Sequence, residues 1–211
     1  MRLGVLGGTF DPPHKGHLRL AAAALDQLGL SRVLWVVTAD PPHKQSHEMA
    51  PVADRLAMVA AAIAGQTSFE LSRVDVDRAG PHWAVDTVAL LAQRHPGAEM
   101  VYLMGGDSLR DLPSWGRPNE FLATARLGVL RRPGDRVDLE ALEKFLPGIS
   151  GRVDFIEAAP DAAASYDIRR RVRDGLPVDD LLPPDVADYI RAHALYRPRL
   201  PNRHPRRVKP N

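Results

Sequence analysis

Short apolar runs alternate with longer amphipathic stretches along most of this chain, and this alternation restricts the possible folds more than any other feature. The runs typical of buried parallel strands are 2–6, 32–38, 100–105, 126–130 and 152–157, and a strand or two is expected within 69–76. Helical patterns lie between them at 16–29, 51–65, 84–95 and 183–196. We therefore expect an α/β fold with a Rossmann-like, doubly wound, mostly parallel sheet and helices on both faces.

The charge is distributed unevenly between the body of the chain and its C-terminal tail. The last fifteen residues hold six Lys or Arg and four Pro but no acid, and the remainder has 22 basic against 26 acidic side chains, a net charge of −4. A nucleic-acid-binding core usually carries a basic face of its own, so we expect no nucleic-acid partner. We expect one folded domain over 1–196 and a disordered, basic, proline-rich tail over 197–211.

Cysteine is absent from the chain, which excludes disulfides and thiolate metal sites. The N-terminal residues carry one positive charge and a short apolar run, unlike a signal peptide. The alanine-rich stretch 18–28 is too short and too polar to span a bilayer. We therefore expect a cytoplasmic protein that does not bind membranes; the sequence leaves the oligomeric state open.

The stretch GGTFDPPHKGH follows the first expected strand, at the position where open α/β sheets bind ligands. Gly7 and Gly8 have no β-carbon, so a phosphate group can approach the backbone closely. A helix is expected to begin near the end of the stretch, with backbone N–H groups that attract anions. His14 and His17 lie one helical turn apart, so both imidazoles can donate hydrogen bonds to one phosphate chain.

The residues alone leave interpretations of this stretch open that do not involve phosphate. A Gly-Gly pair is common in tight turns, a histidine can cap a helix, and a His-x-x-His pair can ligate a metal. No cysteine completes a zinc site, so we expect no metal held by the protein itself.

The stretch GGTFDPPHKGHLR resembles the signature of the nucleotidyltransferase superfamily with a His-x-Gly-His motif, and more narrowly that of the bacterial nicotinate-nucleotide adenylyltransferases. In relatives that transfer AMP to phosphopantetheine, a threonine typically stands where this chain has His14, so the histidine favours the nicotinate branch. Further similar motifs extend the resemblance from residue 3 to residue 196. It implies a nucleotidyltransferase domain over 1–196 and an enzyme of NAD biosynthesis.

The resemblance implies that ATP is bound by residues from several loops. Arg169, at an expected helix start, can bind the β- and γ-phosphates through its planar guanidinium. Asp107 can accept hydrogen bonds from ribose hydroxyls, and it can also cap the following helix. The ATP-binding residues that we expect are Gly7, Gly8, Thr9, Phe10, His14, His17, Gly105, Asp107, Ser165, Ile168 and Arg169.

The nicotinate mononucleotide is expected to contact Lys44, Thr87, Trp115 and Gly116. Lys44 lies in a Pro-Pro-His-Lys loop similar to one in the family, and its charge can neutralise phosphate. The resemblance places Trp115 against the pyridine ring and backbone N–H groups near Gly116 at the nicotinate carboxylate. Each residue also has a structural interpretation: a solvated lysine, a helix hydroxyl bonded to its own backbone for Thr87, or a buried tryptophan. Trp35 and Trp83 are expected to be structural.

The chain departs from the family pattern Ile-Ser-Ser-Thr-x-Ile-Arg near its C-terminal end. It retains Ser165, Ile168 and Arg169 but has Ala163, Ala164 and Tyr166 at the other positions. The departures remove any phosphate contact through a hydroxyl at position 164.

The chemistry expected from these residues is a direct, in-line displacement with pyrophosphate leaving. No side chain resembles a covalent nucleophile, so catalysis comes from positioning and electrostatic stabilisation. The catalytic residues that we expect are His14, His17, Lys44 and Arg169. Mg²⁺ is expected to enter with ATP and to keep most of its waters.

The expected reaction transfers AMP from ATP to nicotinate mononucleotide and yields nicotinate adenine dinucleotide. Three alternatives stay open from the sequence. They are a nicotinamide mononucleotide or dual-specificity adenylyltransferase, a cytidylyl- or phosphopantetheine-transferring relative, and a nucleotide-binding regulator without turnover.

Overall fold

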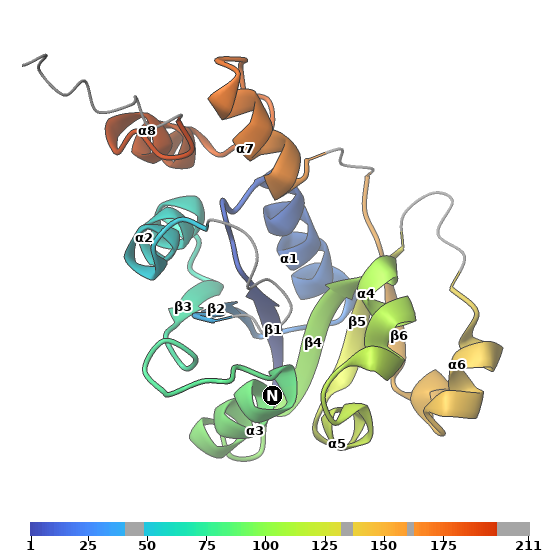
Figure 1. Ribbon diagram of the computed structural model, residues 1–211. Helices are drawn as coiled ribbons and strands as arrows, with labels where there is room; N and C mark the ends of the chain where they lie inside the picture. The colour runs from blue at the N-terminus through green and yellow to red at the C-terminus, as the bar shows by residue number, and fades with distance from the viewer. Residues whose placement is uncertain (41–48, 132–136, 160–162, 198–211) are drawn as a thin grey trace, which may run out of the picture.

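The computed structural model describes residues 1–40, 49–131, 137–159 and 163–197. Its centre is one six-stranded sheet in the order β3-β2-β1-β4-β5-β6, and every neighbouring pair of these strands runs parallel. The strands are β1 (Arg2–Gly8), β2 (Arg32–Val37), β3 (Phe69–Ser72), β4 (Glu99–Gly105), β5 (Arg126–Arg131) and β6 (Val153–Glu157). The expected parallel α/β fold is confirmed (Figure 1).

Helices cover both faces of the sheet, each over its own apolar core. The helices over one face are α1 (Lys15–Gln27), α2 (Val52–Ile63), α7 (Ser165–Arg173) and α8 (Pro184–Ala192). Those over the other are α3 (Ala84–Arg94), α4 (Gly106–Asp111), α5 (Pro118–Thr124) and α6 (Leu139–Phe145), and short 3₁₀ turns lie at Leu112–Ser114 and Ile149–Gly151.

Successive side chains of the central strands point to opposite faces of the sheet, so each strand contributes to both cores. In β2, Val33 and Trp35 face the α1 side while Leu34 and Val36 face the α3 side, and all four are buried. This is why the strand is apolar throughout instead of alternating with polar residues.

Most expected elements were located correctly. The stretch 69–76 contains one strand, β3, which ends at Ser72. Gly29 follows the end of α1 in the left-handed conformation, with φ of 58°. The helices α5 and α6 were not predicted. Asp107 lies in the first turn of α4, whose N-cap is Gly105. The tail beyond residue 197 lies outside the described residues.

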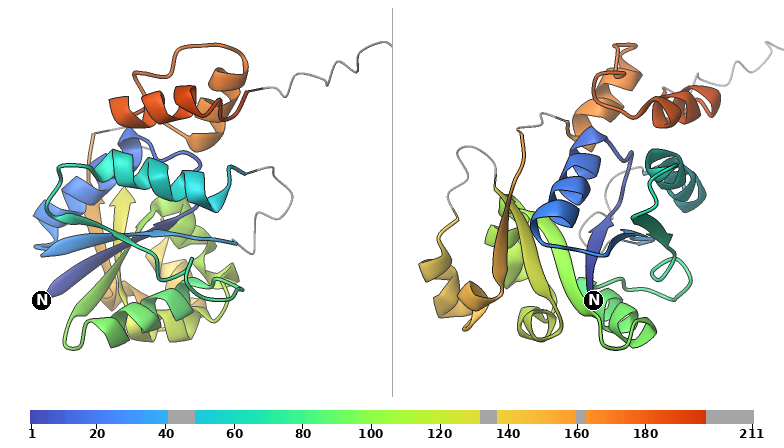
Figure 2. Two further views of the ribbon diagram at one scale, coloured as in Figure 1. Left: turned by 90° about the vertical axis from the view of Figure 1, so that its left-hand side faces the viewer. Right: turned by 180° about the vertical axis from the view of Figure 1, so that it is seen from behind.

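The strand order changes direction at β1, whose neighbours are β2 and β4. The carboxyl ends of β1 and β4 flank this switch point, where doubly wound sheets bind their ligands. The C-terminal helices α7 and α8 lie above α1 and α2, so the last part of the chain returns to the segment that follows β1 (Figure 2).

Candidate active site

The loop between β1 and α1 is held in a conformation that an ordinary residue rarely adopts. Phe10 has φ of 48°, in the left-handed region, although it is not a glycine. Its ring is 2% exposed and packs against the ring of His17, with 5.1 Å between centroids, and against Trp35 at 5.3 Å. Packing on these rings offsets the strain of the backbone and fixes the loop under His17.

His14 and His17 lie face to face at the start of α1, as their spacing predicts. Their ring centroids are 3.7 Å apart with an angle of 30° between planes. The backbone N–H of His14, the N-cap residue, donates a hydrogen bond to Nδ1 of His17 at 3.2 Å. A ring nitrogen that accepts carries no proton, so the ring proton of His17 is on Nε2. This contact therefore makes Nε2 of His17 a hydrogen-bond donor.

Arg169 reaches the same loop from α7. Its Nη1 donates to the backbone carbonyl of Asp11 at 2.8 Å, and the Ser165 hydroxyl donates to the carbonyl of Pro12 at 2.9 Å. The Arg169 side chain retains 19% exposure, so it is accessible to a ligand. The structure thus brings the two imidazoles and the guanidinium to one loop, although the histidines and Arg169 are separated by some 150 residues in sequence.

Sequence analysis did not identify Arg55, which ties several loops together. Arg55 is 1% exposed and donates to the carbonyls of Thr9, Thr38, Ala39 and Ala50 at 2.7 to 3.1 Å. These carbonyls belong to the loops after β1 and β2 and to the segment before α2. Burial lowers the pKa of Arg55, while the neighbouring Asp11 opposes the shift.

Asp11 and Tyr196 were also missed, because they lie at opposite ends of the chain. Asp11 is 2% exposed, and its Oδ1 accepts hydrogen bonds from the Tyr196 hydroxyl at 2.8 Å and from the N–H of Ala50 at 3.2 Å. Burial, and next the charge of Asp11, raise the pKa of Tyr196, so its hydroxyl stays protonated.

The carboxyl ends of β1 and β4 approach each other through Gly7 and Tyr102. A β-carbon at residue 7 would lie 2.5 Å from the Tyr102 hydroxyl, so glycine is needed here. Burial raises the pKa of Tyr102. Gly105 ends β4 and is the N-cap of α4, and the exposed Asp107 lies in the first turn of that helix, at the same edge of the sheet.

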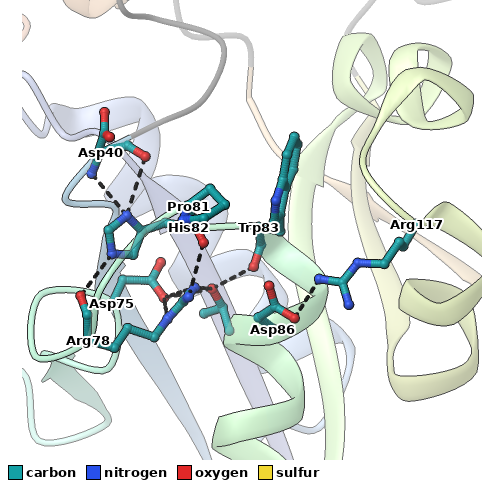
Figure 3. Close-up of polar contacts among 9 residues, drawn as sticks. Asp40, Asp75, Arg78, Pro81, His82, Trp83, Asp86 and Arg117 are labelled. Carbon is teal, nitrogen blue, oxygen red and sulfur yellow. Dashed lines mark hydrogen bonds and ion pairs between the residues drawn. The ribbon is translucent and has the colours of Figure 1, made fainter.

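Thr87 belongs to a buried polar network with Asp75 and Arg78, two residues that Figure 3 labels. Its hydroxyl lies 2.8 Å from Oδ1 of Asp75 and 3.1 Å from the carbonyl of Trp83. Arg78 also donates to Asp75, at 3.0 Å. The Thr87 hydroxyl is thus engaged within the protein, and its contact with a nucleotide stays a prediction.

His82 joins this network to the loop after β2. The ring is 7% exposed, with Nδ1 at 3.3 Å from the backbone of Asp40 and Nε2 at 3.3 Å from the carbonyl of Arg78 (Figure 3). Sequence analysis gave this histidine no role. Lys44 follows in that loop and lies outside the described residues, so its role also stays a prediction.

The segment between α4 and α5 contains Trp115, and a second tryptophan, Trp83, packs against it. Trp115 is half-buried and packs against Tyr102, with 6.0 Å between ring centroids. Trp83 lies against the backbone of Gly116, where a β-carbon would come within 2.6 Å of its ring. Arg117, which follows in the left-handed conformation, pairs with Asp86 at 2.5 Å (Figure 3). Trp83 therefore shapes the loop that presents Trp115 and Gly116.

Some residues expected to contact ATP are buried. Phe10 and Ile168 are 2% and 0% exposed as whole residues, so their contacts with ATP stay predictions. Tyr166, which replaces the family's threonine, is 66% exposed at the start of α7.

No described helix has the length and apolar character to cross a membrane. The described residues also include no cluster of three side chains suited to a metal ion.

Comparisons with known proteins agree with this geometry. The family model described as Cytidylyltransferase-like matches residues 5–171. A protein of Thermomicrobium roseum named "Probable nicotinate-nucleotide adenylyltransferase" is 45% identical over 93% of this chain and 92% of its own. A Gloeobacter violaceus protein with the same name is 42% identical over 92% and 96% of the two chains.

The fold is also that of solved adenylyltransferases. A structure of the Plasmodium falciparum nicotinic acid mononucleotide adenylyltransferase has a TM-score of 0.76 at 16% identity, over 92% of this chain and 97% of that one. This match concerns the fold, and the family model and the sequence relatives establish the family. The chain belongs to the cytidylyltransferase-like family and, within it, to the nicotinate-nucleotide adenylyltransferases.

Proposed function

We propose that this chain transfers the AMP moiety of ATP to nicotinate mononucleotide and releases pyrophosphate, with nicotinate adenine dinucleotide as product. The observation that carries the proposal is the meeting of His14, His17 and Arg169 on the loop after β1. The names of the sequence relatives describe the same activity. The related Plasmodium structures are described as complexes with NaAD and with APC.

Both substrates carry negative phosphates, so the site has to reduce their repulsion before they can react. Arg169 and the two imidazoles are proposed to hold the phosphate chain of ATP beside the N-terminus of α1, whose dipole also favours anions. Arg169 suits the β- and γ-phosphates because its guanidinium can bind two oxygens at once. Lys44 is proposed to add charge on the acceptor side.

His17 is proposed to stabilise the α-phosphate as charge develops in the transition state. Its Nε2 carries a proton because Nδ1 accepts the N–H of His14. The stacked His14 ring and the Phe10 ring hold this donor in place, so little reorganisation is needed during the reaction. The acceptor phosphate then attacks in line while pyrophosphate leaves.

The acceptor is proposed to lie between the ends of β1 and β4, with its pyridine ring on Trp115. The loop of Trp115 and Gly116 is supported by Trp83 and by the Arg117–Asp86 pair. Backbone N–H groups near Gly116 are proposed to bind the nicotinate carboxylate. Mg²⁺ is proposed to enter as Mg-ATP, bound mainly by phosphates and water.

The proposal is tested by measuring pyrophosphate release from Mg-ATP with nicotinate mononucleotide, with nicotinamide mononucleotide and with no acceptor. Release that depends on the nicotinate form supports the proposed reaction. Equal release with both mononucleotides would assign dual specificity. ATP binding without release under any of these conditions would instead favour a nucleotide-binding regulator.

A further inference from the structure

The Asp11 carboxylate lies in the loop between β1 and α1 and joins that loop to the C-terminal segment and to the residues before α2. Its Oδ1 accepts hydrogen bonds from Tyr196 and from the N–H of Ala50. Its Oδ2 lies 3.8 Å from Nη1 of Arg169, which is too far for a hydrogen bond. Nη1 instead donates to the backbone carbonyl of Asp11 at 2.8 Å. Arg169 is therefore positioned by a neutral carbonyl, with the carboxylate close but turned toward Tyr196.

This arrangement matters because a carboxylate and a phosphate compete for the same guanidinium. A direct Arg–carboxylate pair is short and often bidentate, and it would occupy the donors that a polyphosphate requires. The hydroxyl of Tyr196 keeps one carboxylate oxygen engaged, and so opposes rotation of Asp11 toward Arg169.

We propose, on the basis of the function proposed above, that Tyr196 is a positioning residue that holds Asp11 away from Arg169 and so keeps the guanidinium available for the β- and γ-phosphates of ATP. The C-terminal segment thus contributes to the ATP site through a contact between Tyr196 and Asp11, residues 185 positions apart.

The backbone after α8 supports a specific placement of this side chain. Ala194 and Tyr196 both adopt left-handed conformations, with φ of 49° and 62°, which are unfavourable for residues other than glycine. Such strain persists where surrounding contacts offset it. The Tyr196 hydroxyl contacts Asp11 and, at 3.9 Å, the sulfur of Met58. Burial, and next the charge of Asp11, raise the pKa of the Tyr196 phenol, which favours the protonated form that donates to Asp11.

The test is calorimetric titration of full-length Tyr196→Phe with Mg-ATP and with AMP. We expect the Kd for Mg-ATP to rise roughly 3- to 10-fold, the range set by one hydrogen bond of ordinary net strength. The Kd for AMP is expected to stay unchanged, because AMP has no β- or γ-phosphate. An equal loss for AMP, or no loss for ATP, would overturn the proposal.

The chain offers a matched control in Tyr189. Its hydroxyl also donates to a carboxylate oxygen, Oδ1 of Asp54, at 2.8 Å in a partly buried contact. This contact likewise joins the C-terminal region to the rest of the domain. Within the described part of the chain, this pair has no hydrogen bond to the loop between β1 and α1. Tyr189→Phe is therefore expected to leave both Kd values unchanged, and an effect on ATP equal to that of Tyr196→Phe would assign both tyrosines a general structural role.

A double-mutant cycle tests whether Tyr196 acts through Arg169. In an Arg169→Ala background, Tyr196→Phe is expected to have no further effect on ATP binding. A full additional loss would show that Tyr196 acts by another route and would contradict the proposal.

If Tyr196→Phe does not fold, Asp11→Asn provides the same test. An amide does not compete ionically for Arg169, so ATP should bind with equal or lower Kd, and a tenfold rise would overturn the proposal. Calorimetry with ATP alone needs no acceptor, so these outcomes are distinct from failure of the proposed transfer reaction, which appears as absent pyrophosphate release in the unmodified protein.

Discussion

The hydroxyl of Tyr102 lies against the backbone of Gly7, where a β-carbon would come within 2.5 Å of the phenol oxygen. This contact joins the carboxyl ends of β1 and β4 at the switch point of the sheet. The next nearest atom to such a β-carbon is Cζ of the same ring, at 3.3 Å. The hydroxyl alone therefore accounts for most of the steric conflict at residue 7.

Gly7→Ala is expected to lower the free energy of unfolding by about 1–3 kcal/mol, the usual cost of overpacking. The double variant Gly7→Ala, Tyr102→Phe should recover most of this loss, since it removes the clashing oxygen. Urea unfolding measures both effects. Gly151→Ala is the control, because no atom lies within 4 Å of its β-carbon position. A double variant no more stable than Gly7→Ala alone would show that the conflict lies elsewhere.

His17→Ala is expected to lower kcat by roughly 10²–10³ without unfolding the protein, the usual effect of losing one transition-state donor. His95→Ala is a suitable control, because His95 follows α3 at the opposite end of that helix from Trp83. Steady-state kinetics and thermal unfolding together separate catalysis from stability. Near-normal turnover of a folded His17→Ala protein would remove His17 from the mechanism.

Trp115→Ala is expected to raise KM for nicotinate mononucleotide while KM for ATP changes little, because stacking concerns only the pyridine ring. Trp115→Phe should retain part of the affinity, since it preserves an aromatic face. Initial rates with each substrate varied in turn provide both constants. If KM for ATP rose as much as KM for the mononucleotide, Trp115 would not be the stacking residue.

Arg55→Met is expected to destabilise the fold by about 2–5 kcal/mol, because it leaves several buried carbonyls without their donor. Arg55→Lys should recover little, since an ammonium cannot reproduce the planar fork of donors. Arg73→Met is a matched control in an exposed pair with Asp77, where less than about 1 kcal/mol is expected. If denaturant unfolding showed that Arg55→Met loses no more unfolding free energy than Arg73→Met, Arg55 would not stabilise these loops.

Asp154 provides a test of pH dependence away from the site. Hydrogen bonds from Arg126, with the charges of Arg126 and Arg2, hold the pKa of Asp154 below its ordinary value of 3.8 against the opposing effect of burial. A folded-state pKa below the unfolded value means that the folded protein binds this proton less readily. The stabilisation is therefore complete well above pH 4 and is lost as pH falls through the lowered pKa, below about pH 4.

This dependence is measured by comparing unmodified protein with Asp154→Asn in urea at several pH values. The difference in unfolding free energy should be largest near neutral pH and should shrink below about pH 4. A difference that stays constant down to about pH 3 would contradict the lowered pKa.

The strands were predictable because their signal is local. Val33 to Val37 form a continuous apolar run, and such a run inside a parallel sheet is buried on both faces. The short helices α5 and α6 give weak local signals, since their stability depends on burying Phe121 and Leu142 in a core built mainly by other segments.

The site was predictable where one motif carried it and unpredictable where it depends on distant contacts. His14 and His17 lie in one short stretch, so their proximity follows from helical spacing. Arg55 had a signal that was overlooked: with Met58, Val59 and Ala62 it occupies one face of α2 at the spacing of a buried helix stripe. The contact of Tyr196 with Asp11 has no local signal, because only the complete fold brings the two together.

The central claim is that this site transfers AMP from ATP directly to nicotinate mononucleotide. Its most direct test follows the α-phosphorus of radiolabelled ATP in the presence of Mg²⁺ and nicotinate mononucleotide. We expect the label to appear in nicotinate adenine dinucleotide, with one pyrophosphate released per dinucleotide and no label attached to the protein. Label that remains in ATP, or that becomes covalently bound to the protein during turnover, would contradict it.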